Sequence, residues 1–450
     1  MLVWRIVSGE FESTLATTQP EAAAHEQPSE SPGRRRSLQF LGILCGFTAG
    51  AWLGGAEAPT KLVSIGVSPI VISLIMVVGV FLARWSLPAL VLGTASVSAD
   101  VRRAPHLIIW ALLAGCLWAV ANTLTIFAIR DIGLSIAFPL WNANSILGIF
   151  WGFLFFNELR QAGWRRRAGV LGGAAVMCIG AAILAIASAS QSSSAHSLNG
   201  VWAALGAGVL WGTMYIPYRK AYLTGMSPLS FITFFTFGEL GMMGTLALSY
   251  AGSAQLWHEL VQARDVMFWL LLGGFIWVIG DLFQQYAAKY VGISRGIPLS
   301  NTNQLWGMLW GILVFGELHG KSQTTYLQVI GGSLLMMMGV GAIVLSSAGG
   351  EEQLQWKDAA RREGERYGVE EDYVAARFQG RQAASEKLPS RSLVDWLLVA
   401  VATSILIGFA LIARVPQISF HWAPALGLTV ALAVLLWVAG RALWRTTGFH

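Results

Sequence analysis

Apolar residues are grouped in long runs along this chain, with polar residues gathered between the runs. A helix needs about 20 apolar residues to cross the ~30 Å hydrocarbon core of a bilayer. Ten such runs come first, near 38–58, 66–86, 107–129, 133–155, 168–188, 199–219, 227–250, 266–288, 293–316 and 325–346. Two more follow near 393–413 and 422–440. The pattern predicts an all-α polytopic membrane protein with about twelve membrane-spanning helices.

The first ten runs contain an internal repeat. A shift of 159 positions places residues 38–189, within a first repeat of 37–190, on a second repeat of 197–348 without gaps. Two apolar segments seldom match their Trp, Pro, Asn and Glu residues at one offset by chance, so a repeat of this kind decides the architecture. The matches include Trp118 with Trp277, Pro139 with Pro298, Asn142 with Asn301, Asn144 with Asn303, and Glu158 with Glu317. We therefore predict a ten-helix repeat (5+5), followed by two extra C-terminal transmembrane helices in 393–450.

Five helices per repeat is an odd number, so the second repeat must enter the membrane inverted. Cytosolic loops collect Lys and Arg, which tests this orientation. With the N-terminus in the cytosol, the inner loops contain Arg102, Arg103, Arg160, Arg165, Arg166, Arg167, Arg219, Lys220, Lys289 and Arg295. The odd number of helices and the positions of Lys and Arg agree. Together they predict a multi-pass protein of the cell membrane with both termini in the cytosol.

Two polar segments flank or interrupt the apolar runs. Residues 1–36 are rich in Pro, Ser and Glu and lack the apolar core of a secretory signal, so we expect a disordered cytosolic tail. Within 349–392, residues 351–391 hold nine acidic and eight basic residues, a density that no bilayer accommodates. This second segment is predicted to lie in the cytosol.

The composition excludes several classes of protein. Apolar and aromatic residues make up 55% of the 450 residues and charged residues only 12%, unlike a soluble globular enzyme. The net charge of +6 lies beside the apolar runs, which favours topology and anionic lipid over nucleic acid. The three cysteines, at positions 45, 116 and 178, lie within apolar runs and suggest packing rather than a metal site. The chain lacks a G-x-x-x-x-G-K-[ST] motif, and Gly292-x-Ser294-x-Gly296 begins a membrane helix, so we expect neither an enzyme nor a cofactor.

Three segments resemble a known family. LWGTMYIPYRK (Leu210–Lys220) resembles the first helix of a repeat in the drug/metabolite transporter superfamily. Residues Val291–Leu318, and their repeat partner Asp131–Leu159, are similar to the corresponding helix of its glucose/rhamnose-type sugar porters. The resemblance covers roughly residues 37–347 and implies a carrier whose substrate lies between the two halves. Plant-type ureide permeases share a similar plan, and the two added helices depart from it.

Inverted repeats are typical of secondary transporters, in which two halves open one central site to each side in turn. We predict a transporter of a small polar solute, preferably a sugar, that works by alternating access with proton or cation coupling. An exporter or exchanger of another metabolite, such as a ureide, nucleobase or drug-like compound, is the alternative. A non-transporting receptor that recruits a partner through 351–391 is a third possibility. A homodimer is compatible with the sequence, which leaves the oligomeric state open.

Two acids inside the apolar runs are the candidates for coupling. A charge within the hydrocarbon is costly enough to suggest a function. Asp281 and Glu239 both lie in the second repeat, where they replace Asn122 and Val80 of the first. The structural alternative is an acid that hydrogen-bonds to a neighbouring helix.

The candidates for substrate binding are aromatic and amide residues. Aromatic planes cover the C–H faces of a sugar, and amides both donate and accept hydrogen bonds to its hydroxyls. One group shares a face of the third or eighth run, namely Trp118, Asn122, Trp277, Gln284 and Gln285. The other follows Pro139 and Pro298, which disrupt local backbone bonding, and consists of Asn142, Asn144, Asn301, Asn303 and Gln304. Helix packing and interhelical hydrogen bonds are the alternative roles for both groups.

Four charged residues lie at equivalent helix ends of the two repeats. Lys61 and Lys220 could line the entrances on opposite membrane sides, or extend to the lipid headgroups. Glu158 and Glu317 could accept hydrogen bonds from neighbouring backbone amides. We expect all four to be structural or gating residues.

Overall fold

In the computed structural model, the described residues are 32–63, 66–156, 163–189, 195–291, 293–346, 361–370, 391–415 and 420–447. The chain divides into two compact units, Met1–Ser37 and Leu38–His450. Most of the predicted tail 1–36, and most of the predicted cytosolic segment 349–392, lie outside the described residues.

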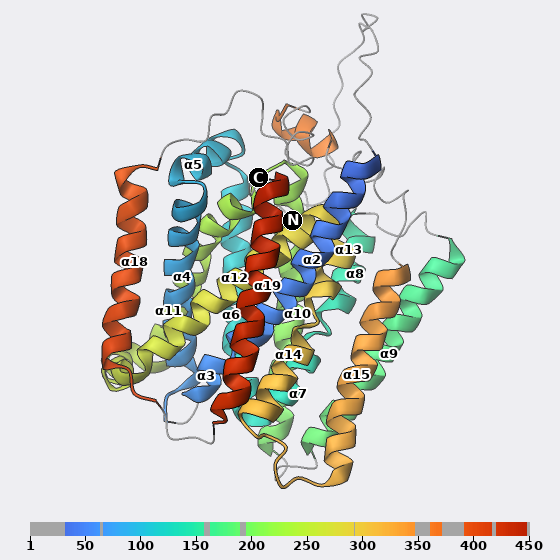
Figure 1. The fold of residues 1–450 in the computed structure, drawn as a ribbon, viewed down its shortest axis with the longest axis vertical. Coiled ribbons are helices and arrows are strands. Elements are labelled where there is room, and N and C mark those ends of the chain that lie inside the picture. The colour runs from blue at the N-terminus through green and yellow to red at the C-terminus, as the bar shows by residue number, and fades with distance from the viewer. Residues whose placement is uncertain are drawn as a thin grey trace, which may run out of the picture. The chain divides into compact units, whose positions relative to one another are not determined.

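The described residues form helices and contain no strand, which confirms the predicted all-α fold class (Figure 1). The first repeat contains α2 (Pro32–Ala56), α3 (Ala58–Leu62), α4 (Pro69–Val91), α5 (Thr94–Arg103), α6 (Leu107–Ile132), α7 (Leu134–Trp141), α8 (Asn144–Phe156) and α9 (Trp164–Ala189). The second contains α10 (Ala195–Leu223), α11 (Pro228–Gln262), η1 (Ala263–Val266), α12 (Met267–Val291), α13 (Ile293–Ser300), α14 (Asn303–Leu309), η2 (Trp310–Val314) and α15 (Gln323–Ser346). The last two helices are α18 (Leu393–Ile412) and α19 (Trp422–Thr447).

Nine stretches of the described residues are long and apolar enough to cross a membrane, fewer than the twelve predicted runs. Two predicted runs, 227–250 and 266–288, fall in one stretch of 64 residues, Pro228–Val291, which holds α11, η1 and α12 and has a kink at Gly252. Neither α10 nor the pair α13 and α14 is among the nine. Each of the twelve predicted runs is helical in the described residues.

The predicted helices 133–155 and 293–316 are each broken. The breaks lie at Asn142–Ala143 and Asn301–Thr302, whereas Pro139 and Pro298 lie inside the short helices that precede them. We expected the backbone to be disrupted at each proline, but each break lies about one helical turn after its proline. At these breaks Asn142 O accepts a hydrogen bond from Ser145 N, and Asn301 O accepts one from Gln304 N. Each of the two carbonyls also accepts a hydrogen bond from the side-chain amide of the other asparagine.

The helix crossings in Leu38–His450 follow the 159-residue offset. Helix α6 packs against α10 and α11, and α4 packs against α11 and α12. A Cβ on Gly238 would collide with the backbone of Leu112, and one on Gly79 would collide with Leu271, which are equivalent pairs. The helices α9 and α15 lie side by side and meet through four equivalent glycines, at positions 173, 180, 332 and 339. Small residues allow this close approach between helices.

The same offset relates the end of α4 to a kink inside α11. Gly93 (φ 85°) and Gly252 (φ 71°) adopt positive φ at equivalent positions, where a residue with a side chain would be strained. The helical turns that follow carry two equivalent acids, each bound to the start of the other repeat's second helix. Asp100 accepts hydrogen bonds from Ser227 N (3.3 Å) and Ser230 Oγ (2.6 Å), and Glu259 accepts one from Ser68 Oγ (2.5 Å).

The last two helices pack on the outside of the repeats. Helix α18 lies against α4, and its Asp395 accepts a hydrogen bond at 2.8 Å from Thr94 N, at the start of α5. Helix α19 is joined to α2 by the bond from Trp52 Nε1 to Leu432 O at 3.0 Å. Most of their remaining side chains are exposed and apolar, as expected for surfaces that face lipid.

Candidate functional site

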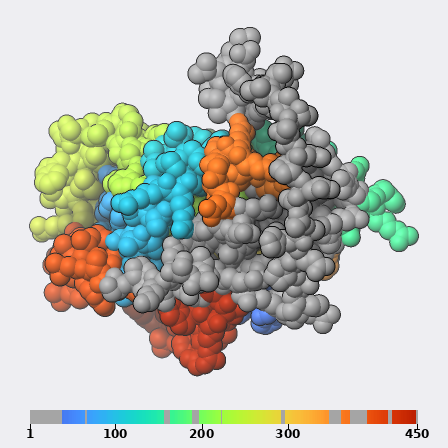
Figure 2. Space-filling model, turned by 90° about the horizontal axis from the view of Figure 1, so that it is seen from above, coloured from blue at the N-terminus to red at the C-terminus, as the bar shows by residue number. Residues whose placement is uncertain are grey.

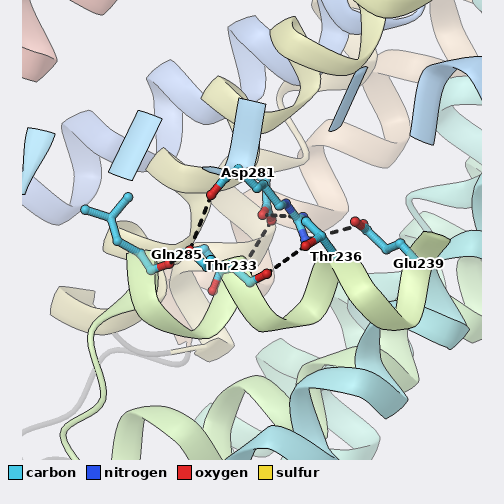
Figure 3. Close-up of polar contacts among 7 residues, drawn as sticks. Thr233, Thr236, Glu239, Asp281 and Gln285 are labelled. Carbon is cyan, nitrogen blue, oxygen red and sulfur yellow. Dashed lines mark hydrogen bonds and ion pairs between the residues drawn. The ribbon is translucent and has the colours of Figure 1, made fainter. Parts of the chain in front are cut away.

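A buried ionic cluster joins the two repeats. Arg84, on α4, forms ion pairs with Asp281 on α12 (Nη2 to Oδ2, 2.9 Å) and with Glu239 on α11 (Nη1 to Oε1, 3.3 Å). All three side chains are fully buried. Gln285 Nε2 donates to the other Asp281 oxygen at 3.0 Å, and Thr233 Oγ1 donates to the Arg84 carbonyl at 3.3 Å. Figure 3 shows Asp281 and Glu239 approaching this cluster from different helices.

The sequence identified both acids but missed the cation. Arg84 lies near the end of the predicted run 66–86, where a basic residue normally marks the membrane surface. Helix α4 continues through Pro88 to Val91, which places Arg84 well inside the span. The signal in the sequence was that residues 85–92, which follow Arg84, are apolar except for Ser86.

The equivalent positions of the two repeats do not form a second ionic cluster of this kind. At the offset of 159, Arg84 corresponds to Met243, Glu239 to Val80 and Asp281 to Asn122. One repeat therefore supplies the cation and the other supplies both carboxylates, and the ion pairs cross from one half to the other.

The two predicted tryptophans meet beside this cluster. Trp118 and Trp277 are both buried, and their ring centroids lie 4.7 Å apart in an edge-to-face arrangement. The Arg84 guanidinium lies 5.2 Å from the Trp277 ring and 4.2 Å from the Phe235 ring. Cations are attracted to aromatic faces at such distances. The Trp118 Nε1 donor is buried and has no hydrogen-bond partner among the described residues.

The four predicted asparagines form one symmetric network at the two helix breaks. Asn142 Nδ2 donates to Asn303 Oδ1, and Asn301 Nδ2 donates to Asn144 Oδ1 at 2.9 Å. Together with the two bonds to the carbonyls of Asn142 and Asn301, these contacts tie α7 and α8 to α13 and α14. In this conformation the amides mainly bond to one another, as the interhelical alternative predicted.

The remaining predicted amides are dispersed. Gln284 Nε2 donates to Ser300 Oγ, and Asn122 Nδ2 donates to Ser73 Oγ at 2.9 Å. Gln304 is fully buried, and neither its amide nitrogen nor its oxygen has a hydrogen-bond partner among the described residues. Leaving such groups unpaired is costly.

The two predicted entrance lysines have different partners. Lys61 Nζ lies 3.3 Å from Glu317 Oε1. Glu317 also accepts hydrogen bonds from Leu134 N and Ser135 N, both at 2.9 Å, and from Ser135 Oγ at 2.6 Å, which confirms that it binds backbone amides at the start of a helix. Lys220 Nζ instead binds Glu363 Oε1 at 2.7 Å. Glu158 lies outside the described residues.

Glu317 makes this end of the protein sensitive to acid. Burial by itself raises the pKa of Glu317, but Lys61 and the hydrogen bonds from Ser135 and Leu134 lower it below the ordinary value of 4.5. A depressed pKa contributes stability that is present above pH 4.5 and is lost as the pH falls through the folded-state pKa.

We expect Glu317→Gln to lower the free energy of unfolding by about 1–3 kcal/mol at pH 7, because hydrogen bonds to a charged acceptor are lost. Thermal unfolding in detergent, measured from pH 7 to pH 3, checks this. The wild type should lose more stability than the variant over that range. Parallel pH curves would contradict the assignment.

Comparisons with known proteins agree on one class of protein. Residues 204–364 match the model of a family described as sugar transport protein. The chain is 24% identical over 252 residues to the "Probable glucose uptake protein GlcU" of Staphylococcus aureus, covering 54% of this chain and 79% of that protein. It is 25% identical over 223 residues to the "Glucose uptake protein GlcU" of Staphylococcus xylosus, covering 48% and 71%. These matches support a sugar transporter family.

Proposed function

We propose that this protein is a secondary active transporter of the drug/metabolite transporter superfamily that takes up a sugar by alternating access, coupled to a proton or another cation. The matches to sugar transport and glucose uptake proteins support the substrate class. The observation that carries the coupling is the buried cluster of Arg84, Glu239 and Asp281, which spans the two repeats. The positive charge of the α4–α6 and α8–α9 loops supports a cytosolic position for both termini.

The charges of the cluster provide a reason for coupling. One guanidinium and two carboxylates carry a net charge of −1 when all are ionised, and an uncompensated charge in this setting is costly. A proton or monovalent cation bound at Asp281 or Glu239 would make the cluster neutral. Release of that cation would leave Arg84 with two competing anions, which changes the attraction between α4 and the pair α11 and α12. Binding of the cation therefore biases how the two halves pack.

The tryptophans connect this cluster to the substrate. Trp277 contacts both Arg84 and Trp118, so a sugar stacked on these rings would lie next to the ion pairs. Gln304 and Trp118 Nε1 supply buried polar groups for its hydroxyls. Under this proposal, Asn142, Asn144, Asn301 and Asn303 hold the broken helices together and reach substrate only when their mutual hydrogen bonds open.

The test is uptake into proteoliposomes that contain the purified protein, with an imposed pH or sodium gradient. Radiolabelled glucose and other sugars are compared with a panel of ureides and nucleobases. We expect gradient-driven accumulation of a sugar, and its loss by at least tenfold in Asp281→Asn and in Glu239→Gln, with exchange of sugar across the membrane retained. Asp265→Asn, which removes an acid that is paired with Arg414 outside the cluster, serves as the control.

Each part of the proposal has its own contrary result. Accumulation that persists in both acid variants would overturn coupling through the cluster. Transport of ureides or nucleobases without any sugar would support the alternative metabolite carrier. Sugar binding without flux in any condition would support the receptor.

A further inference from the structure

Segment 361–370 docks on the repeats although it belongs to neither. Figure 2 shows it in orange, against the light-blue region that contains α5. Glu363 binds Lys220, in the last turn of α10, at 2.7 Å. Tyr367 stacks on His106, which precedes α6, with ring centroids 3.7 Å apart and an interplanar angle of 11°. The docked segment therefore contacts the ends of two helices through both charge and ring stacking.

These two helices come from different halves of the protein. Helix α6 belongs to the first repeat and α10 to the second, and they pack along each other. A segment that holds His106 with one side chain and Lys220 with another connects the halves at this end. Movement of α6 relative to α10 at this end would break one of these contacts.

The opposite end shows the partner of Lys61, the repeat equivalent of Lys220. Lys61 binds Glu317, which lies within the repeats and caps α7. The repeat equivalent of Glu317 is Glu158. Glu363 thus supplies to Lys220 the carboxylate that, at the other end, comes from inside the ten-helix bundle.

We propose that segment 361–370 is an inhibitory latch that holds α6 and α10 together and so restrains opening at this end. This inference rests on the proposed transport function. Glu363 and Tyr367 are the two contacts of the latch, and neither lies in the ionic cluster or beside the tryptophans. Removal of either contact increases the rate of the conformational change without altering the coupling ion.

The first test compares initial rates of sugar uptake by full-length variants in proteoliposomes. Loss of an ion pair of this exposure changes an equilibrium or rate constant by up to about fivefold. We therefore expect Glu363→Gln and Tyr367→Ala each to raise the uptake rate about three- to fivefold. Glu365→Gln is the matched control, because Glu365 pairs only with Arg361 of the same segment in the described contacts and is exposed. Rates equal to the wild type in both latch variants would overturn the latch.

The second test fixes the latch in place. His106→Cys and Tyr367→Cys are combined in a chain whose native cysteines are replaced by alanine. A short methanethiosulfonate cross-linker should join the two thiols and abolish most transport, and a reductant should restore it. Unchanged transport in the cross-linked protein would also overturn the latch. Absence of sugar uptake by every variant, the wild type included, would instead overturn the proposed function and the latch with it.

Discussion

Replacement of Arg84 by methionine is expected to lower the free energy of unfolding by about 3–5 kcal/mol, because it leaves buried carboxylates without their cation. The equivalent residue of the second repeat is Met243, so a methionine side chain has a suitable size for this helix crossing. Glu239 and Asp281 would then face one another within the hydrocarbon without compensation. Thermal unfolding in detergent measures the loss, and sugar accumulation should disappear with it.

A rescue experiment separates the charge from the shape of Arg84. In the triple variant Arg84→Met, Glu239→Val and Asp281→Asn, every residue of the cluster is the one that the other repeat carries. Replacing a buried ionic group completely is often neutral for stability, so we expect this protein to unfold near the wild-type temperature. It should still lack gradient-driven transport. A triple variant as unstable as Arg84→Met, or a single variant as stable as the wild type, would contradict the role assigned to the cluster.

Gly238→Ala is expected to have the second large effect. An added Cβ would lie 2.8 Å from the carbonyl carbon of Leu112 and closer still to its oxygen, so α11 and α6 would have to separate. Overpacking of this kind costs about 1–3 kcal/mol. Because Glu239 is the next residue, the displacement would also weaken its contact with Arg84 and reduce transport.

Gly241→Ala, on the same helix, is the matched control. Nothing lies within 4 Å of a Cβ at Gly241, and alanine is the better helix former. We expect it to unfold at or above the wild-type temperature, whereas Gly238→Ala unfolds well below it. Equal stability of the two variants would show that α6 and α11 do not approach as closely as the structure indicates.

The sequence by itself determined the all-helical fold, because the length of each apolar run is set by the thickness of the bilayer. It also determined the repeat, since one offset matched residues that apolar composition does not explain. The offset of 159 relates the glycine contacts at the helix crossings and the φ angles of Gly93 and Gly252. The backbone contact of Glu317 could be foreseen for a similar reason, because a carboxylate next to a helix start commonly bonds its free N–H groups.

Tertiary structure alone decided which groups neutralise the buried acids and which groups bond the asparagines. Arg84 lies 155 positions or more from both of its partners in the chain, and no local pattern encodes such a pairing. Lys220 and Glu363 are likewise distant in sequence, and the repeat suggested a different partner. Apolar runs specify only that a helix enters the membrane. The rotation and neighbours of that helix follow from the packing of all the others, and these decide which polar side chains meet inside the bundle.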